Sequence, residues 1–345
     1  MKKIIVAPLN WGLGHATRCV PIIQSLLKNN FTPIIASDGN ALLYLKKEFP
    51  TLEAIELPSY YISYSKNLKW HLLLQIPKVQ KTIANERRII EKYIDTHNNV
   101  IGIISDNRFG VRSTRVPSVY ITHQINVLSG WATFVTSYVH QRIIRKFDEC
   151  WIPDDEHSVF SGKLSTSKKK LNQKYIGTLS RLKKEEGKKE YDIAVVLSGV
   201  EPNRSELEKK LLNELNKYKG QVIFIRGVIE TKQRKSVQGN IIVYNYLLSE
   251  ELQSILNKAE LVVSRSGYSS IMDYAALEKK AILIPTKGQT EQEYLGSFLG
   301  KTQKIICVDE DAFSLSIIEK AKKTKGLIVE ETILGEKLFS LFKRK

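Results

Sequence analysis

Short runs of β-branched and other apolar residues alternate with longer amphipathic stretches through most of this 345-residue chain. Such alternation predicts strand–helix–strand units, whose strands run parallel and whose helices cover the faces of the sheet. The first half is therefore predicted to be one doubly wound α/β domain. Its predicted strands are 3–7, 32–36, 100–105, 118–122, 150–152 and 174–177, and its predicted helices include 17–29 and 41–48.

A charged stretch separates this half from a second run of the same pattern. Residues 181–190 read RLKKEEGKKE, a composition that cannot bury a core and is typical of an interdomain linker. We predict domains at 1–179 and 191–328, a linker at 180–190, and a final segment at 329–345 whose helix, over about 331–342, can pack back on the first domain. In the second domain the predicted strands are 191–197, 221–226, 240–244, 261–264 and 281–285, and the predicted helices are 204–217, 249–258 and 269–277.

The net charge of the chain is strongly positive. Lysine and arginine total 53 against 36 acidic residues, a formal excess of +17. The resulting field attracts anions such as nucleotides, nucleic acid or an acidic lipid surface, although an ordinary basic, solvated surface explains the same charge. Nucleic acid is not expected as a partner, because the chain has neither a basic stripe interleaved with stacking aromatics nor a recognisable nucleic-acid module.

The cysteines and the apolar runs bear on the compartment. Cys19, Cys150 and Cys307 lie far apart without metal-ligand spacing, so neither a disulfide framework nor a metal site is expected. The apolar run at 4–9 is interrupted by a proline and is too short for a signal peptide. No run approaches the roughly 20 apolar residues that span a bilayer. We therefore expect a protein of the reducing cytoplasm.

The turn after the first predicted strand reads NWGLGH, and ligands of open α/β sheets bind at such turns, beyond the carboxyl ends of the strands. Gly12 and Gly14 lack a Cβ, so the backbone there can approach a ligand closely. A dinucleotide-binding fingerprint would need a third glycine where Thr17 stands, and Asp38 would have to hold the ribose. The turn by itself leaves an incomplete fingerprint and an ordinary loop as alternatives.

His15 ends this turn at the start of the first predicted helix. The helix macrodipole disfavours an imidazolium at this end, and a neutral imidazole can accept a proton. The alternative is a histidine that only caps or hydrogen-bonds the turn. From this residue alone, catalysis and capping have equal weight.

The turns of the second domain are rich in small and polar residues. Ser198-Gly199 follows its first strand, and residues 264–270, SRSGYSS, follow a later one. Small residues at helix starts present free N–H groups to anions. Asp273, on the helix after SRSGYSS, either faces a ligand or is a solvated acid near the helix start. Residues 286–294, TKGQTEQEY, suit sugar hydroxyls or form a solvated helix start.

Three motifs taken together resemble the GT-B glycosyltransferases of family 28. They are GLGHATR in the first turn, and SRSGYSSIMDYAAL and IPTKGQTEQEYLG in the second domain. The resemblance spans both domains, and the ordered pair of second-domain motifs is its more specific part. It implies the GT-B fold, in which two Rossmann-like doubly wound domains face a cleft. It also implies transfer of a sugar from a nucleotide diphosphate, expected to be a UDP-sugar, to an acceptor hydroxyl.

The matching motif positions imply roles for individual residues. By this resemblance His15 lies at the active site between the domains, Asp273 binds the ribose hydroxyls of the donor, and Gln292 with Glu293 reads the donor sugar. The implied donor-binding set is Gly12, Gly14, Arg181, Ser198, Gly199, Tyr246, Leu247, Arg265, Ser266, Gly267, Asp273, Gln289, Gln292 and Glu293.

The expected reaction is inverting and metal-independent, with no cofactor besides the donor substrate. No acidic pair follows a strand where a divalent ion would bind. The helix N-termini of the second domain, together with Arg181 or Arg265, would then neutralise the leaving diphosphate. His15, or in its place Asp106 or His123, would take the proton of the acceptor hydroxyl.

Departures from the family pattern leave the substrates open. The first loop is poorer in glycine than the family's, SGVEPNR replaces a Gly-Gly-Ser-rich loop, and Glu293 stands where the family has a second glutamine. The donor sugar can be an N-acetylhexosamine, and the acceptor a lipid-linked or other cell-envelope glycan. A UDP-sugar hydrolase on the same fold and a non-catalytic nucleotide-sugar or nucleic-acid binding protein remain alternatives.

One further segment bears on location. Residues 66–74, KNLKWHLLL, mix basic, aromatic and leucine residues. Such a mixture suits a helix lying in a lipid interface, and leucines of a protein core explain it equally well. The expectation is a cytoplasmic protein that can bind peripherally to the anionic inner face of a membrane.

Overall fold

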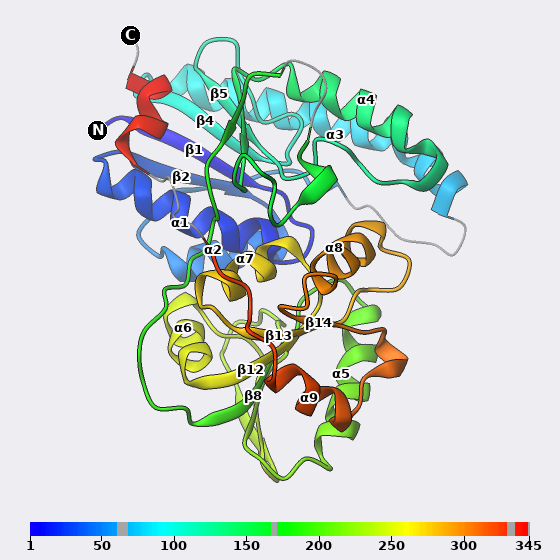
Figure 1. Cartoon of the computed structure of the whole chain (residues 1–345). Coiled ribbons are helices and arrows are strands. Elements are labelled where there is room, and N and C mark those ends of the chain that lie inside the picture. The colour runs from blue at the N-terminus through cyan, green and yellow to red at the C-terminus, as the bar shows by residue number, and fades with distance from the viewer. Residues whose placement is uncertain (61–67, 167–170, 330–334, 344–345) are drawn as a thin grey trace.

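The computed structural model describes residues 1–60, 68–166, 171–329 and 335–343, except the side chains of 68–76 and Trp131. The chain forms two α/β domains, one above the other, each built on a seven-stranded sheet (Figure 1). The first sheet ends with Tyr175 and the second begins with Tyr191. The prediction of an α/β protein with two doubly wound sheets is confirmed.

The first sheet has the strand order β3-β2-β1-β4-β5-β6-β7, and its neighbouring strands are parallel. Both faces are covered, which explains the continuous apolar runs in its strands. Ile4 packs on the face that carries α1, and the next residue, Ile5, packs with Ile90 of α3 on the other. The strands are β1 (Lys3–Pro8), β2 (Thr32–Ser37), β3 (Ala54–Glu56), β4 (Val100–Asp106), β5 (Ser118–Ile121), β6 (Glu149–Ile152) and β7 (Gln173–Tyr175); the helices are α1 (Gly14–Lys28), α2 (Gly39–Glu48), α3 (Leu68–Thr96) and α4 (Thr133–Ile144).

The second sheet has the strand order β10-β11-β9-β8-β12-β13-β14, parallel except for the β10–β11 pair at one edge. The strands are β8 (Tyr191–Val196), β9 (Val222–Ile225), β10 (Lys235–Gln238), β11 (Ile241–Tyr244), β12 (Ala259–Ser264), β13 (Lys280–Leu283) and β14 (Ile306–Cys307); the helices are α5 (Asn203–Leu215), α6 (Ser249–Lys258), α7 (Tyr268–Ala276), α8 (Thr290–Gly300) and α9 (Leu315–Lys322). Short 3₁₀ helices η1 (Gly130–Ala132), η2 (Gly162–Leu164), η3 (Glu310–Ala312) and η4 (Glu336–Lys343) complete the described elements.

Each sheet reverses its winding direction at its centre, between β1 and β4 in the first domain and between β8 and β12 in the second. At such a switch point the adjacent loops diverge and open a crevice. His15 follows β1 and Asp106 ends β4, while Ser198 follows β8. The two crevices face each other, because a Cβ placed on Gly12 would lie only 3.8 Å from the Cα of Gly199. The topology thus directs the predicted site residues toward a common cleft.

The starts of α1 and α8 affect the site, and that of α1 differs from its predicted position. Helix α1 begins at Gly14, three residues before its predicted start, so His15 lies within the first helical turn. Residues 286–289 form the turn expected after β13, and α8 begins at Thr290. Glu291 and Glu293 stand in the first turn of α8, where acidic side chains complement the helix dipole.

The predicted linker contains neither a helix nor a strand over 181–190, and it lies along α6. The backbone N–H of Lys183 donates to Gln253 Oε1 at 2.8 Å, and that of Glu185 donates to Asn257 Oδ1 at 3.0 Å. Leu182 is buried among the core residues. The linker is therefore attached to the second domain along part of its length.

The end of the chain packs on the first domain. Element η4 is a 3₁₀ helix that begins at Glu336, later than the predicted helix; residues 330–334 of that prediction lie outside the described part of the chain. The Phe339 ring packs edge-on against Phe31, with centroids 6.1 Å apart, and the Phe342 ring packs in the same manner against Trp151 at 6.3 Å. Figure 1 shows this segment, in red, beside α1 and β1.

The two domains are in direct contact across the cleft. Tyr268 at the start of α7 donates its hydroxyl hydrogen to Pro153 O at 2.7 Å, and the hydroxyl of Ser269 donates to Gly14 O at 2.8 Å. On the other side, Glu48 of α2 accepts from the backbone N–H of Ser249 at 2.7 Å. The domains are therefore in a closed arrangement.

Within the described ranges, no helix has the length and apolar character needed to cross a bilayer.

Candidate active site

The three residues predicted for catalysis come together around Arg18, a residue of α1. Arg18 donates from Nε and Nη2 to the carboxylate of Asp106, and its Nη1 lies 3.0 Å from His123 Nδ1. His15 Nδ1 lies 2.8 Å from Asp106 Oδ1. Arg18, Asp106 and His123 are buried, whereas the side chain of His15 keeps 17% of its surface exposed. We refer to His15, Arg18, Asp106 and His123 as the histidine cluster.

The hydrogen bonds in the histidine cluster determine where the ring protons lie. A guanidinium can only donate, so His123 Nδ1 accepts from Arg18 and the ring proton of His123 lies on Nε2. Burial lowers the pKa of His123, which favours its neutral form. Burial by itself would raise the pKa of the Asp106 carboxyl, but Arg18 and His15 hold that pKa well below its usual range.

Asp106 is therefore ionised and can only accept hydrogen bonds. Arg18 Nη2 lies 2.8 Å from His15 Nδ1 and already donates to Asp106 Oδ1. In the tautomer that donates from Nδ1 to this carboxylate, the lone pair of the His15 ring lies on Nε2; in the other tautomer, Nδ1 accepts from Arg18 Nη2. A histidine oriented in this way by a buried carboxylate can accept a proton from a bound hydroxyl.

A buried charge network holds the end of β4, where Asp106 lies. Arg108 donates from Nε to Pro8 O at 2.9 Å, from Nη1 to Glu86 Oε1 at 2.7 Å, and from Nη2 to Asp38. It thereby ties the end of β1 to α3 and to the start of α2. Asp38, the residue that the dinucleotide fingerprint would need for the ribose, is buried in this network and bonded to Arg108.

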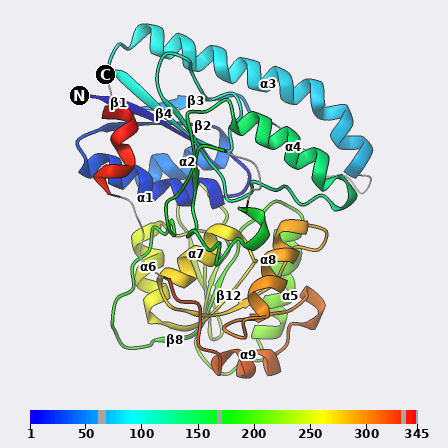
Figure 2. The same ribbon diagram turned by 45° about the horizontal axis from the view of Figure 1, so that its top comes forward.

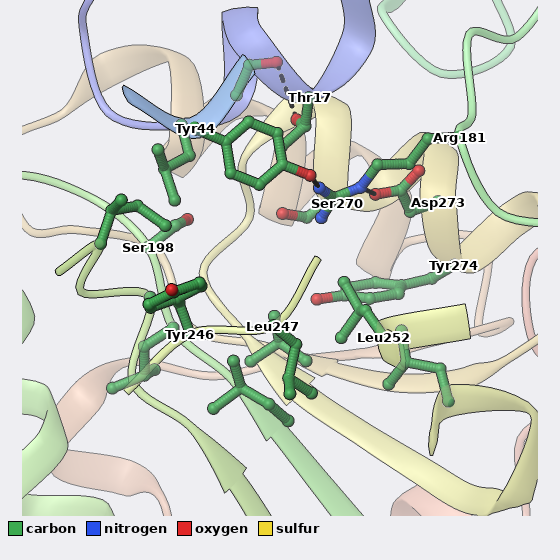
Figure 3. Close-up of a pocket in the computed structure, with 18 residues that line it drawn as sticks. Thr17, Tyr44, Arg181, Ser198, Tyr246, Leu247, Leu252, Ser270, Asp273 and Tyr274 are labelled. Carbon is green, nitrogen blue, oxygen red and sulfur yellow. Dashed lines mark hydrogen bonds and ion pairs between the residues drawn. The ribbon is translucent and has the colours of Figure 1, made fainter. Parts of the chain in front are cut away.

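A small cavity lies between the domains next to the histidine cluster (Figure 3). Gly14 and Thr17, which flank His15 on α1, line it from the first domain. Tyr246 and Leu247 line its apolar side from the second domain. Its volume is about 60 Å³, which is room for about two water molecules. Ligand pockets usually measure upward of about 300 Å³, so a nucleotide needs the cleft to open or its side chains to move.

The polar side of the cavity is formed by Tyr44, Arg181 and Asp273, which point toward one another in Figure 3. Asp273 lies in the middle of α7 and is buried, so it is not the solvated acid that one interpretation predicted. Its Oδ2 lies 3.6 Å from Arg181 Nε, and its Oδ1 accepts from Ser180 Oγ at 2.7 Å. Arg181 also donates to the Tyr44 hydroxyl. A ribose hydroxyl would have to replace one of these partners to reach Asp273.

The predicted donor residues separate into two groups in the structure. The cavity is lined by Gly14, Arg181, Ser198, Tyr246, Leu247 and Asp273. Arg265 lies elsewhere: its guanidinium is buried and donates to Glu310 Oε1 at 2.6 Å and to Asn203 O at 2.8 Å. This arginine is engaged inside the second domain and is not directed to the cavity. Of the two arginines expected to neutralise the diphosphate, Arg181 is therefore the one that reaches the cleft.

The expected sugar-reading residues bond to their own turn. Gln292 Oε1 accepts from the Thr286 N–H at 2.9 Å, and Glu293 Oε1 accepts from the Gly288 N–H at 2.7 Å. Ser266 Oγ donates to Gln292 O at 2.8 Å. Of the remaining predicted residues, Gln289 and Gly267 are the N-caps of α8 and α7, and Gly12 and Gly199 meet where the two crevices face each other.

Sequence reasoning missed four residues that the structure places at the histidine cluster or the cavity. Arg18 is part of GLGHATR and lies one helical turn after His15, so helical spacing could have placed the two on one face. Tyr44, Tyr268 and Glu291 gave no such signal. Tyr44 lines the cavity, the Tyr268 ring stacks on His123 with centroids 4.0 Å apart, and Glu291 bonds to His123. Their positions depend on the packing of one domain against the other.

Known proteins resemble the chain in both sequence and fold. Residues 159–325 match the sequence model of the glycosyltransferase family 28 C-terminal domain. A curated relative from Clostridium kluyveri is UDP-N-acetylglucosamine--N-acetylmuramyl-(pentapeptide) pyrophosphoryl-undecaprenol N-acetylglucosamine transferase. It is 29% identical over 119 residues, and the alignment spans a third of each protein.

Solved structures extend the likeness to the whole fold. A UDP-glucosyltransferase from Polygonum tinctorium superposes with a TM-score of 0.65 at 12% identity, covering 100% of this chain and 99% of that one. MurG from Acinetobacter baumannii superposes with a TM-score of 0.54 at 11% identity, covering 93% of this chain and 89% of that one. The glycotransferase of kitacinnamycin gives 0.63 at 10% identity, with coverages of 99% and 93%.

The two facing sheets and these structural likenesses define the fold as that of the GT-B glycosyltransferases. Residues 159–325 are similar to the C-terminal domain of glycosyltransferase family 28, as the second-domain motifs led us to expect. That domain includes the linker, α7 with Asp273, and the turn before α8.

Proposed function

We propose that this protein is an inverting, metal-independent glycosyltransferase that moves a sugar from a UDP-sugar to an acceptor hydroxyl. The observation that carries the proposal is the placement of His15. It is oriented by the buried Asp106 and stands between Gly14 and Thr17, both of which line the cavity between the domains. The proton acceptor and the cavity thus share one helical turn.

The proposed step is a single displacement. The acceptor oxygen attacks the anomeric carbon from the face opposite the diphosphate, the bond from that carbon to the phosphate oxygen breaks, and the configuration inverts. The acceptor proton passes to His15 Nε2, while Asp106 stabilises the imidazolium that forms. Arg181 and the backbone N–H groups near Ser198 and at the N-terminus of α7 stabilise the charge on the departing diphosphate. No cofactor takes part in this step.

The cavity supports a nucleoside diphosphate as the donor. Tyr246 and Leu247 offer an aromatic and apolar surface for a base, and Asp273 accepts ribose hydroxyls once Arg181 moves toward the diphosphate. We propose uridine as the nucleoside and an N-acetylhexosamine as the sugar, because the curated relative is named for UDP-N-acetylglucosamine. That relative's undecaprenol-linked acceptor supports a lipid-linked glycan acceptor here.

Thermal shift and calorimetry test the donor proposal. We expect UDP and UDP-N-acetylglucosamine to raise the melting temperature and NAD to leave it unchanged. Asp273→Ala should weaken UDP binding about 10- to 100-fold, because a charged hydrogen-bond acceptor is lost. Glu319→Gln, an exposed change on α9, is the control and should bind UDP as the parent does. A parent protein that UDP does not stabilise would exclude the proposed donor.

Product analysis separates the alternatives. A UDP-sugar hydrolase releases free sugar at its full rate without an acceptor, whereas the proposed transferase needs the acceptor for turnover. A non-catalytic binding protein shows UDP stabilisation and no UDP release with any acceptor. The three outcomes can be distinguished by measuring UDP and free sugar with and without lipid-linked glycans.

We also propose that the protein binds peripherally to an anionic membrane surface through α4. The predicted segment 66–74 has no described side chains. Helix α4 runs beside α3 (Figure 2), and several of its apolar side chains are exposed. Phe134 is 78% exposed and Val139 is 51% exposed. Basic residues that can meet acidic headgroups follow this face at Arg142, Arg145 and Lys146.

Vesicle flotation tests the α4 proposal. We expect binding to vesicles containing phosphatidylglycerol and none to phosphatidylcholine alone. The double variant Phe134→Ser/Val139→Ser should bind the acidic vesicles at least about 10-fold more weakly, because two apolar side chains no longer enter the lipid. Val237→Ser changes a valine that is 65% exposed in the second domain and should leave binding intact. Equal loss in both variants would contradict the assignment to α4.

A further inference from the structure

Glu291 extends from the second domain to the histidine cluster of the first. It is the second residue of α8, and its Oε1 lies 2.6 Å from His123 Nε2. The side chain of Glu291 is 25% exposed and that of His123 is 7% exposed. Glu291 precedes the two residues expected to read the sugar, and the sequence comparison with the family gave it no role.

One stacked ring and two hydrogen bonds fix the position of the His123 ring. Its ring lies flat on Tyr268 of α7, with centroids 4.0 Å apart and planes 3° from parallel. Its Nδ1 accepts from Arg18, and its Nε2 donates to Glu291. A continuous chain of hydrogen bonds therefore runs from Glu291 through His123 and Arg18 to Asp106, the partner of His15.

Three contacts hold the start of α8 against the first domain. Thr290 Oγ1 donates to Leu128 O at 3.0 Å, the Tyr294 hydroxyl accepts from the Lys163 N–H at 2.9 Å, and Glu291 accepts from His123. Thr290 and Tyr294 bond to backbone groups, of the loop at Leu128 and of η2, whereas Glu291 bonds to the histidine cluster. Parting the domains to admit a nucleotide would break all three.

We propose that Glu291 is a positioning residue that couples closure of the cleft to the arrangement of His15. This inference rests on the proposed transferase function. In the closed form, Glu291 accepts a hydrogen bond from the Nε2–H of His123 and so keeps the ring proton on Nε2, which leaves Nδ1 free to accept from Arg18. Arg18 is then fixed against both oxygens of Asp106, and that carboxylate holds His15 by Nδ1. In the open form the His123 Nε2–H loses its acceptor, so the hydrogen bond between Glu291 and His123 is absent from the chain that leads to Asp106.

Kinetics on three variants test this coupling. Glu291→Ala should lower kcat about 10- to 100-fold, as expected for loss of a charged hydrogen-bond partner, and should leave the affinity for UDP unchanged. Glu291→Gln keeps an oxygen acceptor and should recover part of that loss. Thr290→Ala removes an interdomain hydrogen bond on the same helical turn without touching His123, so its kcat should stay close to that of the parent.

Two kinetic outcomes would overturn the proposal. If Glu291→Ala raises KM for the donor and leaves kcat unchanged, Glu291 binds the sugar and does not position the cluster. If Thr290→Ala loses as much kcat as Glu291→Ala, closure itself matters and the bond to His123 does not.

Nuclear magnetic resonance of ¹⁵N-histidine-labelled protein gives a readout that does not depend on turnover. The parent should show His123 protonated on Nε2 with a downfield proton resonance, as expected for a short hydrogen bond to a carboxylate. Glu291→Ala should lose that resonance and shift the signals of His15, while Glu291→Gln should retain it at a less extreme position. Unchanged His123 and His15 signals in Glu291→Ala would refute the coupling. If no nucleotide sugar is turned over, the proposed function fails, and these spectra still decide the role of Glu291.

Discussion

Replacement of His15 by alanine is expected to lower kcat by about 100- to 10,000-fold, which is the range for loss of a general base. The acceptor hydroxyl would lose the nitrogen that receives its proton. UDP binding should persist, because the cavity is lined by Gly14 and Thr17 and by second-domain residues, not by the imidazole of His15. Steady-state transfer assays combined with UDP calorimetry measure the two quantities separately.

The control for this prediction is His157→Ala, an exposed histidine of the first domain, which should keep the kcat of the parent. Asp106→Asn should also lower kcat, since an amide can donate to Nδ1 and thereby move the ring proton to Nε2. A His15→Ala protein that binds UDP and transfers sugar at the parental rate would contradict the assignment of the base. In that case His123, the other imidazole of the cluster, would be tested next.

The second large effect is expected at Arg108. Arg108→Met should lower the free energy of unfolding by about 3–5 kcal/mol, the usual result of removing one partner from a buried ion pair. Arg108 is fully buried and is the partner of both Asp38 and Glu86. The Asp38 carboxylate would stay buried without its partner, Glu86 would lose the donor to its Oε1, and the end of β1 would lose its bond through Pro8 O. Urea denaturation followed by circular dichroism gives the measurement.

The loss of unfolding free energy in Arg108→Met should also depend on pH. Burial raises the pKa of Glu86 to about 8. The folded protein therefore holds this proton at pH values where the unfolded chain, with an ordinary glutamate pKa, has released it. The stability contributed by the protonated form is complete below the ordinary pKa of glutamate and declines as pH rises toward about 8. Without Arg108 to compensate the carboxylate, the deficit should be larger at pH 8 than at pH 5.

Arg115→Met serves as the comparison for Arg108. Arg115 pairs with Glu91 and Asp95, but its side chain is 44% exposed. Exposed pairs contribute little because water screens them, so the denaturation midpoint should not change measurably. Equal midpoints for the Arg108 and Arg115 variants would show that the buried network does not hold the β1 and β4 ends together.

Periodicity predicted much of the fold because each helix and strand carries its burial pattern locally. Most strands of both domains follow from alternating apolar runs, and one charged stretch predicted the linker at 180–190. The short strands β3, β10 and β14 were not predicted. Helix α4 was not predicted, since its apolar residues face outward as well as inward and give weak amphipathicity. The final segment was predicted as a helix, and it is a 3₁₀ helix whose phenylalanines pack on the first domain.

For the candidate site as well, local motifs predicted which residues take part but not how their side chains are directed. The glycine turn and the strand–turn–helix unit of the second domain pointed to His15 and Asp273, because both are local features of the sequence, and the family resemblance added Arg181. The same motifs also pointed to Arg265, Gln292 and Glu293, whose side chains the structure shows bonded within the second domain. A motif specifies residue type and position along the chain, and it does not specify which way a side chain turns.

Tertiary structure alone decided how the histidine cluster is assembled. Asp106 reaches His15 because β4 lies next to β1 in the parallel sheet, although a long crossover separates these strands in the chain. His123 follows β5, the next strand beyond β4, and reaches Arg18. Glu291 reaches His123 only because the second domain closes on the first. Amino-acid sequence determined the two α/β domains and the glycine turn through local propensity and burial. The charge partners of His15 depend on contacts between distant segments, and those contacts exist only after the sheets and domains have packed.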